Sequence, residues 1–331
     1  MKDILYKLFE RQYLSKEEAE NVLSNIAQSK YSNEQVASLI TVFLMRSITV
    51  DELLGFQQAL LKMRVHVDLD GLKVMDIVGT GGDGKNTFNI STCSCFVVAA
   101  SGYPVVKHGN YGATSVSGAS NVIEQHGVKF TKDIDKIKES INKTGIAYLH
   151  APFFSPALKA VAPIRKSLAV RTFFNMLGPL VNPCLPTYQL LGVYNLPLLR
   201  LYSYLYQASG TKYAVVHSLD GYDEISLTST FKVANSFNEK VYEPEDLGFK
   251  RAKEEDLFGG STPEDAAKIF DNVLMNKASE SQKNVVVANS AFAINIICPE
   301  KSIQECISEA RETLESGKAL ATFKKFVEFN S

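Results

Sequence analysis

The sequence lacks the features that would point to a membrane, a nucleic acid or an oxidising compartment. It has no run of 18 apolar residues, and its N-terminus lacks the continuous apolar segment of a secretory signal. Charges nearly cancel, with 35 Lys and Arg against 36 Asp and Glu, so neither an anionic membrane nor a nucleic acid is expected as a partner. The five cysteines are odd in number and scattered, and no internal repeat or low-complexity tract occurs. This composition favours free thiols and a soluble, cytoplasmic protein.

What is present is enough for two domains: 331 residues, of which 45% are hydrophobic. Residues 1–70 show only helical patterns. Capping signals at 15–18, 32–35 and 49–52 each precede apolar residues at helical spacing. This predicts a small helical domain, which part of 155–185 is expected to join. Its apolar faces are expected to pack on each other or on a second copy of the chain.

From residue 71 to 331, short apolar runs alternate with helical patterns. The expected strands are 74–78, 104–107, 146–150, 189–194 and 213–217, and helices are expected over 134–141, 157–168, 196–208, from 263, and over 302–329. The acidic, interrupted segment 231–260 is expected to add strands and loops at the sheet edge. The predicted fold class is α/β: a small N-terminal helical domain and a larger domain with a mostly parallel sheet flanked by helices.

A glycine-rich loop follows the first predicted strand, with four glycines among the six residues 79–84. Glycines let successive backbone N–H groups converge on anionic oxygens, which predicts a phosphate-binding loop. The loop also matches two commoner nucleotide motifs, G-x-G-x-x-G and G-x-x-x-x-G-K. However, the next strand ends in Lys107 instead of an acidic residue, and Asn86 stands where the second motif needs Ser or Thr. A glycine-rich turn without a ligand is the remaining alternative.

Three further segments carry candidate binding groups. Lys107 begins a polar loop whose ammonium could meet a phosphate, although a solvated loop is the alternative. Asp223 and Glu224 are adjacent in a turn that could aim both carboxylates at a hard cation such as Mg²⁺, and two solvated acids are the alternative. Arg165, on an expected helix, could bind a carboxylate with two hydrogen bonds or form a surface salt bridge. His217 is expected to be a core histidine.

Six segments together resemble the anthranilate phosphoribosyltransferase family, a branch of the nucleoside phosphorylase-like transferases. They are GTGGD at 79–83, TFNIST at 87–92, KHGN at 107–110, VAPIRK at 161–166, RTFFNMLGPLVNP at 171–183 and VVHSLDGYDEIS at 215–226. The resemblance implies transfer of the phosphoribosyl group of 5-phosphoribosyl 1-diphosphate (PRPP) to the amine of anthranilate in tryptophan biosynthesis, with release of pyrophosphate. It also implies two Mg²⁺ ions per subunit and a homodimer formed through the N-terminal helical domain.

The resemblance assigns residues by position. PRPP is expected at Gly79, Gly82, Asp83, Thr87, Asn89, Ile90, Ser91, Thr92, Lys107, His108, Gly109, Asn110, Tyr111, Gly112, Ala113, Thr114, Ser115 and Ala119. Anthranilate is expected at Gly79, His108, Asn110 and Arg165, and Mg²⁺ at Ser91, Asp223 and Glu224. No general base is assigned, because a neutral aromatic amine needs little activation and orienting two bound reactants can supply most of the rate.

The second loop departs from the usual family form, GNRxxSSKSGSAD. This chain has Tyr111 for the arginine, Val116 for the lysine, Ala119 for a serine and Asn121 for the aspartate, and it has His150 for a frequent phenylalanine and Ser155 for a frequent histidine. Two positive charges are therefore missing near the phosphates, and weaker PRPP binding is one expected consequence. Two alternative functions are a pyrimidine-nucleoside phosphorylase, which shares the fold, and a non-catalytic nucleic-acid-binding relative, which only the altered loop suggests.

Overall fold

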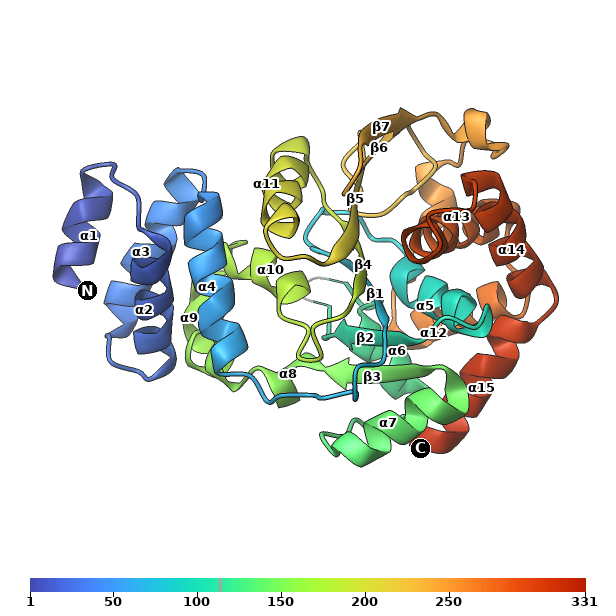
Figure 1. Cartoon of the computed structure of the whole chain (residues 1–331), viewed down its shortest axis with the longest axis horizontal. Helices are drawn as coiled ribbons and strands as arrows, with labels where there is room; N and C mark the ends of the chain where they lie inside the picture. The colour runs from blue at the N-terminus through green and yellow to red at the C-terminus, as the bar shows by residue number, and fades with distance from the viewer. Residues whose placement is uncertain (113–114) are drawn as a thin grey trace. The chain divides into compact units, whose positions relative to one another are not determined.

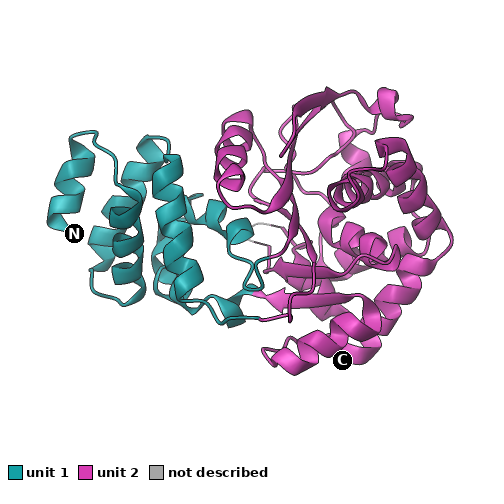
Figure 2. Ribbon diagram, in the orientation of Figure 1, with its two compact units in different colours: residues 1–67, 151–185 teal, residues 68–150, 186–331 magenta. Residues whose placement is uncertain are grey.

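The computed structural model describes residues 1–112 and 115–331, which form two compact units (Figure 2). Unit 1 comprises residues 1–67 and 151–185, and unit 2 comprises residues 68–150 and 186–331. Both units are therefore built from two separate stretches of the chain. Among the described residues, no helix is long and apolar enough to cross a membrane.

Unit 1 is helical. Its elements are α1 (Lys2–Phe9), α2 (Lys16–Ala27), α3 (Asn33–Met45), α4 (Val50–Lys62), α8 (Ala151–Phe154), α9 (Ala162–Leu168) and α10 (Phe174–Leu177), with 3₁₀ turns η1 (Pro156–Ala160) and η2 (Gly178–Leu180). The three predicted capping boxes are confirmed, at Ser15, Ser32 and Thr49. The ring of Phe173 lies 5.0 Å from that of Phe43 and 4.8 Å from that of Phe56, so the later segment shares the core of the first four helices.

The single helix expected over 157–168 is wrong. The structure has the 3₁₀ turn η1 followed by the separate helix α9. Pro156 begins the turn and Pro163 lies in the first turn of α9. Because proline has no backbone N–H and is favoured at a helix start, each proline begins a new element.

Unit 2 is built on a seven-stranded sheet (Figure 1). The strands are β1 (Met75–Gly79), β2 (Val105–Gly109), β3 (Ile146–His150), β4 (Tyr188–Gly192), β5 (Lys212–Ser218), β6 (Phe231–Asn235) and β7 (Glu239–Tyr242). Their order is β3-β2-β1-β4-β5-β6-β7. Pairs among the first five strands are parallel, and β6 and β7 join antiparallel at one edge. The mostly parallel sheet and the edge strands in 231–260 are thus confirmed.

Helices cover this sheet, and one of them has no amphipathic pattern. The helices are α5 (Ile90–Ala100), α6 (Ala119–Gln125), α7 (Ile134–Thr144), α11 (Leu196–Gln207), α12 (Pro263–Leu274), α13 (Glu280–Ile297), α14 (Ile303–Glu315) and α15 (Lys318–Asn330), with 3₁₀ turns η3 (Pro244–Leu247) and η4 (Glu254–Leu257). Every residue from 285 to 294 of α13 is buried. A helix that is buried on all sides shows no helical period, which explains why the sequence pattern did not predict it.

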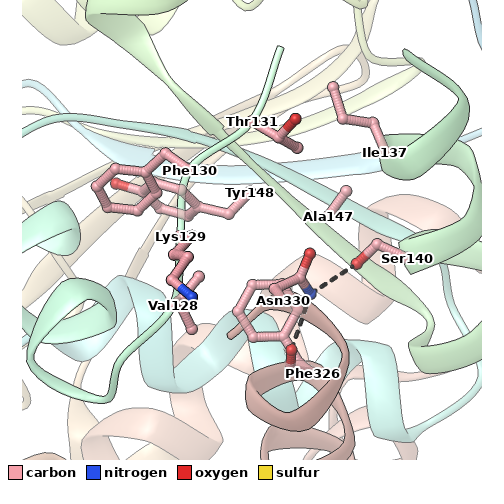
Figure 3. A pocket seen from close by; sticks show the side chains of 10 residues that line it. All are labelled: Val128, Lys129, Phe130, Thr131, Ile137, Ser140, Ala147, Tyr148, Phe326 and Asn330. Carbon is pink, nitrogen blue, oxygen red and sulfur yellow. Dashed lines mark hydrogen bonds between the residues drawn. The ribbon is translucent and has the colours of Figure 1, made fainter. Parts of the chain in front are cut away.

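The C-terminal helix α15 is fastened at its last turn. Asn330 donates from Nδ2 to Ser140 Oγ at 3.2 Å and to the Phe326 carbonyl at 2.8 Å, and its own carbonyl accepts from the Lys129 backbone N–H at 2.8 Å. These residues line a small pocket bounded by α7, β3 and α15 (Figure 3). Since the amide of Asn330 is bonded on both sides, this pocket serves to anchor the chain end.

A histidine links α6 to α12 and predicts a pH-dependent contribution to stability. His126 Nδ1 lies 2.7 Å from the Val122 carbonyl and Nε2 lies 2.9 Å from Asp271 Oδ1, so both nitrogens face acceptors. Burial opposes the charge, but the hydrogen bonds to Asp271 and Val122 and the carboxylate charge raise the pKa of His126 overall. The stabilisation is therefore present below the unfolded-state pKa of about 6.5 and is lost as the pH rises through the folded-state pKa.

Asp271→Asn is expected to remove about 1 kcal/mol of unfolding free energy near pH 5.5 and less at pH 9. Urea unfolding of both proteins across this range would measure the difference. Glu139→Gln, which breaks the exposed pair between Glu139 and Lys143, is a matched control whose effect should not vary over this range. A deficit in the Asp271 variant that is constant from pH 5.5 to 9 would contradict the role given to His126.

Candidate active site

Three carboxylates of unit 2 lie together: Asp83, Asp223 and Glu224, with one oxygen of each within 4.8 Å of the others. Asp83 belongs to the glycine-rich loop after β1, whereas Asp223 and Glu224 belong to the turn after β5. In the sheet β4 lies between β1 and β5. The turn after β5 must therefore pass over the end of β4 to reach the glycine-rich loop.

Two glycines leave the space for this crossing. Gly79 and Gly192 end β1 and β4 and are paired in register. A Cβ atom on Gly192 would lie 1.4 Å from the backbone oxygen of Asp223, and one on Gly79 would lie 2.5 Å from Asp223 Oδ2. The Gly81 backbone N–H donates to the same carboxylate oxygen at 2.5 Å. The acidic turn thus occupies the place where side chains would otherwise stand.

The acidic turn is also held from its own strand and from α13. Ser218 Oγ donates to the Glu224 carbonyl at 2.7 Å. Asn289 of α13 accepts from the Ile225 backbone N–H at 3.2 Å and donates from Nδ2 to the Ile225 carbonyl at 2.9 Å. His217 is buried with Nδ1 2.9 Å from the Val193 carbonyl, which confirms the expected core histidine.

The three carboxylates are poorly compensated. Burial, with the charge of Asp223, raises the pKa of Asp83 to about 7, and burial also raises the pKa of Asp223. Burial, followed by the charges of Asp223 and Asp83, raises the pKa of Glu224 well above its usual range. Asp83 Oδ2 and Glu224 Oε2 are buried and accept no hydrogen bond from the described residues. A divalent cation with oxygen ligands would satisfy these atoms and relieve the repulsion, so the cluster fits Mg²⁺.

Lys107 supplies the positive charge nearest to this cluster from below. It lies on β2 with only 2% of its surface exposed, and its charge favours the ionised form of Glu224. Its ammonium donates to the Ile77 carbonyl at 2.7 Å and to Ser91 Oγ at 3.3 Å. The structure therefore places this ammonium against protein oxygens. It also places Ser91, predicted to bind Mg²⁺, next to that ammonium.

The glycine-rich loop has the backbone of an anion-binding turn. Gly81, Gly82 and Gly84 have φ of 67°, 74° and 80°, a region that favours glycine. Asn89 caps α5, because its Oδ1 accepts from the Thr92 backbone N–H at 2.9 Å. Since α5 begins at the end of this loop, the positive end of its dipole faces the predicted phosphate site.

A distant segment, residues 254–260, holds the end of this loop. The Phe88 backbone N–H donates to the Leu257 carbonyl at 2.9 Å, and that of Gly259 donates to the Asn86 carbonyl at 2.8 Å. A Cβ atom on Gly259 would lie 2.3 Å from the Thr87 carbonyl oxygen. The sequence gave no signal for this pairing, because the two segments lie far apart in the chain.

The second predicted loop reaches the first through Ser117. Its Oγ donates to the Thr87 carbonyl at 2.7 Å, and its carbonyl accepts from Asn89 Nδ2 at 2.7 Å. His108 and Gly109 are on β2 with Lys107, and Ala119 begins α6. Ala113 and Thr114 lie outside the described residues. The structure therefore brings the described PRPP candidates of both loops into one unit, on neighbouring strand ends and at the starts of α5 and α6.

Arg165 belongs to unit 1 and is described there alone. It lies on α9, where Nη2 donates to Asn175 Oδ1 at 3.3 Å and the guanidinium carbon is 5.7 Å from the centre of the Phe174 ring. Burial lowers the pKa of its guanidinium. Arg165 has one side-chain amide partner at this distance, and its charge is partly withdrawn from water.

Comparison with known proteins adds to this geometry. Residues 71–320 match the model described as "Glycosyl transferase family, a/b domain", and residues 2–63 match "Glycosyl transferase family, helical bundle domain". An anthranilate phosphoribosyltransferase of Bacteroides thetaiotaomicron is 72% identical over 331 residues, which is all of both chains. The chain belongs to the anthranilate phosphoribosyltransferase family. The resemblance inferred from the six segments is thus confirmed.

Solved structures of this family have the same fold. The enzyme of Thermus thermophilus is 32% identical, with a TM-score of 0.91, and 98% of each chain is covered. The Saccharomyces cerevisiae enzyme in complex with PRPP and Mg is 27% identical, with a TM-score of 0.90, over 98% of this chain and 96% of that chain. A further yeast structure contains 4-fluoroanthranilate. These findings support a phosphoribosyl-transferring glycosyltransferase and neither of the two alternative functions.

Proposed function

We propose that this protein transfers the 5-phosphoribosyl group of PRPP to the amine of anthranilate and releases pyrophosphate. The cluster of Asp83, Asp223 and Glu224 carries this proposal, because it joins the glycine-rich loop to a site suited to a hard cation. In this reaction the bond between ribose C1 and the pyrophosphate oxygen breaks, and the amine nitrogen forms the new bond to C1. The departing group is strongly anionic, so the reaction needs positive charge where these carboxylates lie.

Magnesium would be held by Asp223 and Glu224, with Ser91 as a further ligand and two ions per subunit. When bound, it would neutralise the developing charge of the leaving group. The backbone N–H groups of Gly79 and Gly82 and the start of α5 would bind the phosphates. A magnesium-bridged site also accounts for acidic residues beside a phosphate loop, because carboxylates alone would repel the substrate.

Anthranilate would be bound by Arg165 through its carboxylate, with Gly79, Asn110 and His108 near its ring and amine. The amine is uncharged and nucleophilic at neutral pH. We therefore assign no general base, and the protein would accelerate the reaction by orienting the two substrates, an effect worth roughly 7 to 11 kcal/mol. The proton of the new ammonium group can leave to water after the bond has formed.

Anthranilate fluorescence tests this function directly. Protein, PRPP, Mg²⁺ and anthranilate should extinguish the fluorescence of anthranilate, and mass spectrometry should find N-(5-phosphoribosyl)anthranilate and pyrophosphate. Reactions without PRPP, or with a chelator in excess of Mg²⁺, are the controls. Unchanged fluorescence at saturating substrate concentrations would overturn the proposal.

Arg165→Ala is expected to raise KM for anthranilate about 10- to 100-fold, because a charge-assisted hydrogen bond is worth about 1.5 to 3 kcal/mol. KM for PRPP should change little. Lys166→Ala is the matched control, since Lys166 is exposed on the same helix. Steady-state kinetics with each substrate varied would measure the change. An unaltered KM for anthranilate would remove Arg165 from the acceptor site.

A homodimer formed through unit 1 is also part of the proposal. Large exposed apolar side chains gather on α1, the turn after it and the end of α3: Tyr6, Phe9, Tyr13, Leu44 and Met45, of which Met45 is 84% exposed. A patch of this kind is typical of an interaction surface. Light scattering should give the mass of two chains, and Phe9→Glu should shift it toward one. We also propose a cytoplasmic location, in keeping with the free cysteines.

A further inference from the structure

The residues by which the second loop departs from the usual family form are gathered in one network on α6. The Tyr111 hydroxyl donates to Glu124 Oε1 at 3.0 Å. Its ring meets the His150 ring edge-on, with 5.1 Å between ring centres. Asn121 Oδ1 accepts from the Gly112 backbone N–H at 2.9 Å. Three of the replaced positions therefore act on the same short stretch, Asn110 to Gly112.

The surface on which Tyr111 packs is itself fixed. His150 Nδ1 lies 2.9 Å from Ser120 Oγ, and the same oxygen lies 2.7 Å from the Tyr148 hydroxyl. Phe130 stacks on His150 at 4.3 Å and on Tyr148 at 5.3 Å between ring centres; Figure 3 shows Phe130 beside Tyr148. Burial lowers the pKa of His150, although Glu124 opposes this shift, so the ring is neutral at pH 7. Tyr111 thus rests on a rigid, uncharged aromatic support.

The backbone of the stretch is also tightly folded against the start of α6. The Ser120 backbone N–H donates to the Asn110 carbonyl at 3.1 Å. The Tyr111 backbone N–H donates to Asn110 Oδ1 at 2.8 Å. A Cβ atom on Gly118 would lie 2.0 Å from the Gly112 nitrogen, so the two strands of the loop touch. A loop that is already ordered loses less conformational entropy when a ligand binds.

We propose that Tyr111 is a positioning residue, whose hydroxyl on Glu124 and ring on His150 hold Asn110 to Gly112 in the PRPP-binding conformation before the substrate arrives. This inference rests on the proposed function, since it assigns the loop to PRPP. A neutral contact replaces the two missing positive charges: the loop gains affinity from its prior order where a charged loop gains it from attraction. Asn121 supports the same conformation through Gly112.

Tyr111→Phe separates the hydroxyl from the ring. It is expected to raise KM for PRPP about fivefold, the effect of one net hydrogen bond, while kcat and KM for anthranilate change less than twofold. Glu124→Ala should have the same effect, and the double variant should be no worse than either single one. Glu124→Gln should restore most of the affinity, because its amide oxygen still accepts the bond. Tyr204→Phe, on an exposed tyrosine of α11, is the control.

Amide hydrogen exchange keeps this test independent of turnover. In the substrate-free protein, exchange at Asn110 to Gly112 should become faster in Tyr111→Phe and stay unchanged in Tyr204→Phe. An unaltered KM for PRPP, multiplying effects in the double variant, or unchanged exchange would each overturn the role of Tyr111. Absence of transfer by the unmodified protein would instead overturn the proposed function, and the exchange result would still decide the positioning role.

Discussion

Replacing Asp223 and Glu224 together by Asn and Gln is expected to lower turnover by about 10²- to 10³-fold while the fold persists. Removal of both carboxylates would take away the charges that hold Mg²⁺, whose stabilisation of a leaving group is worth several kcal/mol. Stability should not fall, because the native state raises the pKa values of both carboxyl groups. A raised carboxyl pKa means that ionisation at neutral pH costs stability, and neutral amides avoid that cost.

Two measurements check this expectation. Kinetics over a range of Mg²⁺ concentrations should show the loss of turnover, and thermal unfolding should show that Mg²⁺ raises the Tm of the unmodified protein and not that of the variant. Glu245→Gln with Asp246→Asn is a matched control, since it neutralises an exposed, adjacent acid pair in η3. Magnesium-dependent turnover at the unmodified level would show that these carboxylates do not bind the ion.

Features written within one short segment could be predicted from the sequence. The capping boxes at Ser15, Ser32 and Thr49 need only four neighbouring residues, and each of them formed. The five parallel strands followed from apolar runs bounded by turns, with ends within about two residues of the observed ones. The carboxylate pair in its turn and the glycine-rich loop were visible for the same reason.

Features that depend on the order of strands could not be predicted. Asp83 joins the acidic cluster because β1 and β5 flank β4, an order that no local pattern contains. Lys107 was expected to meet a phosphate, yet its ammonium lies under the site, because its position on β2 directs it to the Ile77 carbonyl. The pairing of Gly259 with Asn86 likewise needs the whole fold. The sequence thus indicated which groups form the site, and the sheet decided which of them meet.

Gly192→Ala is expected to be the most destabilising single change near the site. Its Cβ would lie 1.4 Å from the backbone oxygen of Asp223, and backbone in a well-packed turn cannot move as a side chain can. We expect a loss of about 3 kcal/mol or more in unfolding free energy. Gly178→Ala is the control: Gly178 has helical backbone angles and no described atom within 4 Å of the added carbon, so it should be neutral or slightly stabilising.

Gly79→Ala separates stability from function at the same crossing. Its Cβ would meet the end of the Asp223 side chain, 2.5 Å from Oδ2 and 3.0 Å from Cγ, and a carboxylate can rotate away. We therefore expect a smaller loss of stability than in Gly192→Ala and a larger loss of Mg²⁺ affinity per unit of stability lost. Urea unfolding and magnesium titrations of both variants would give this order. Equal stability losses would mean that the turn after β5 shifts as one body, and the glycines would then have no separate roles.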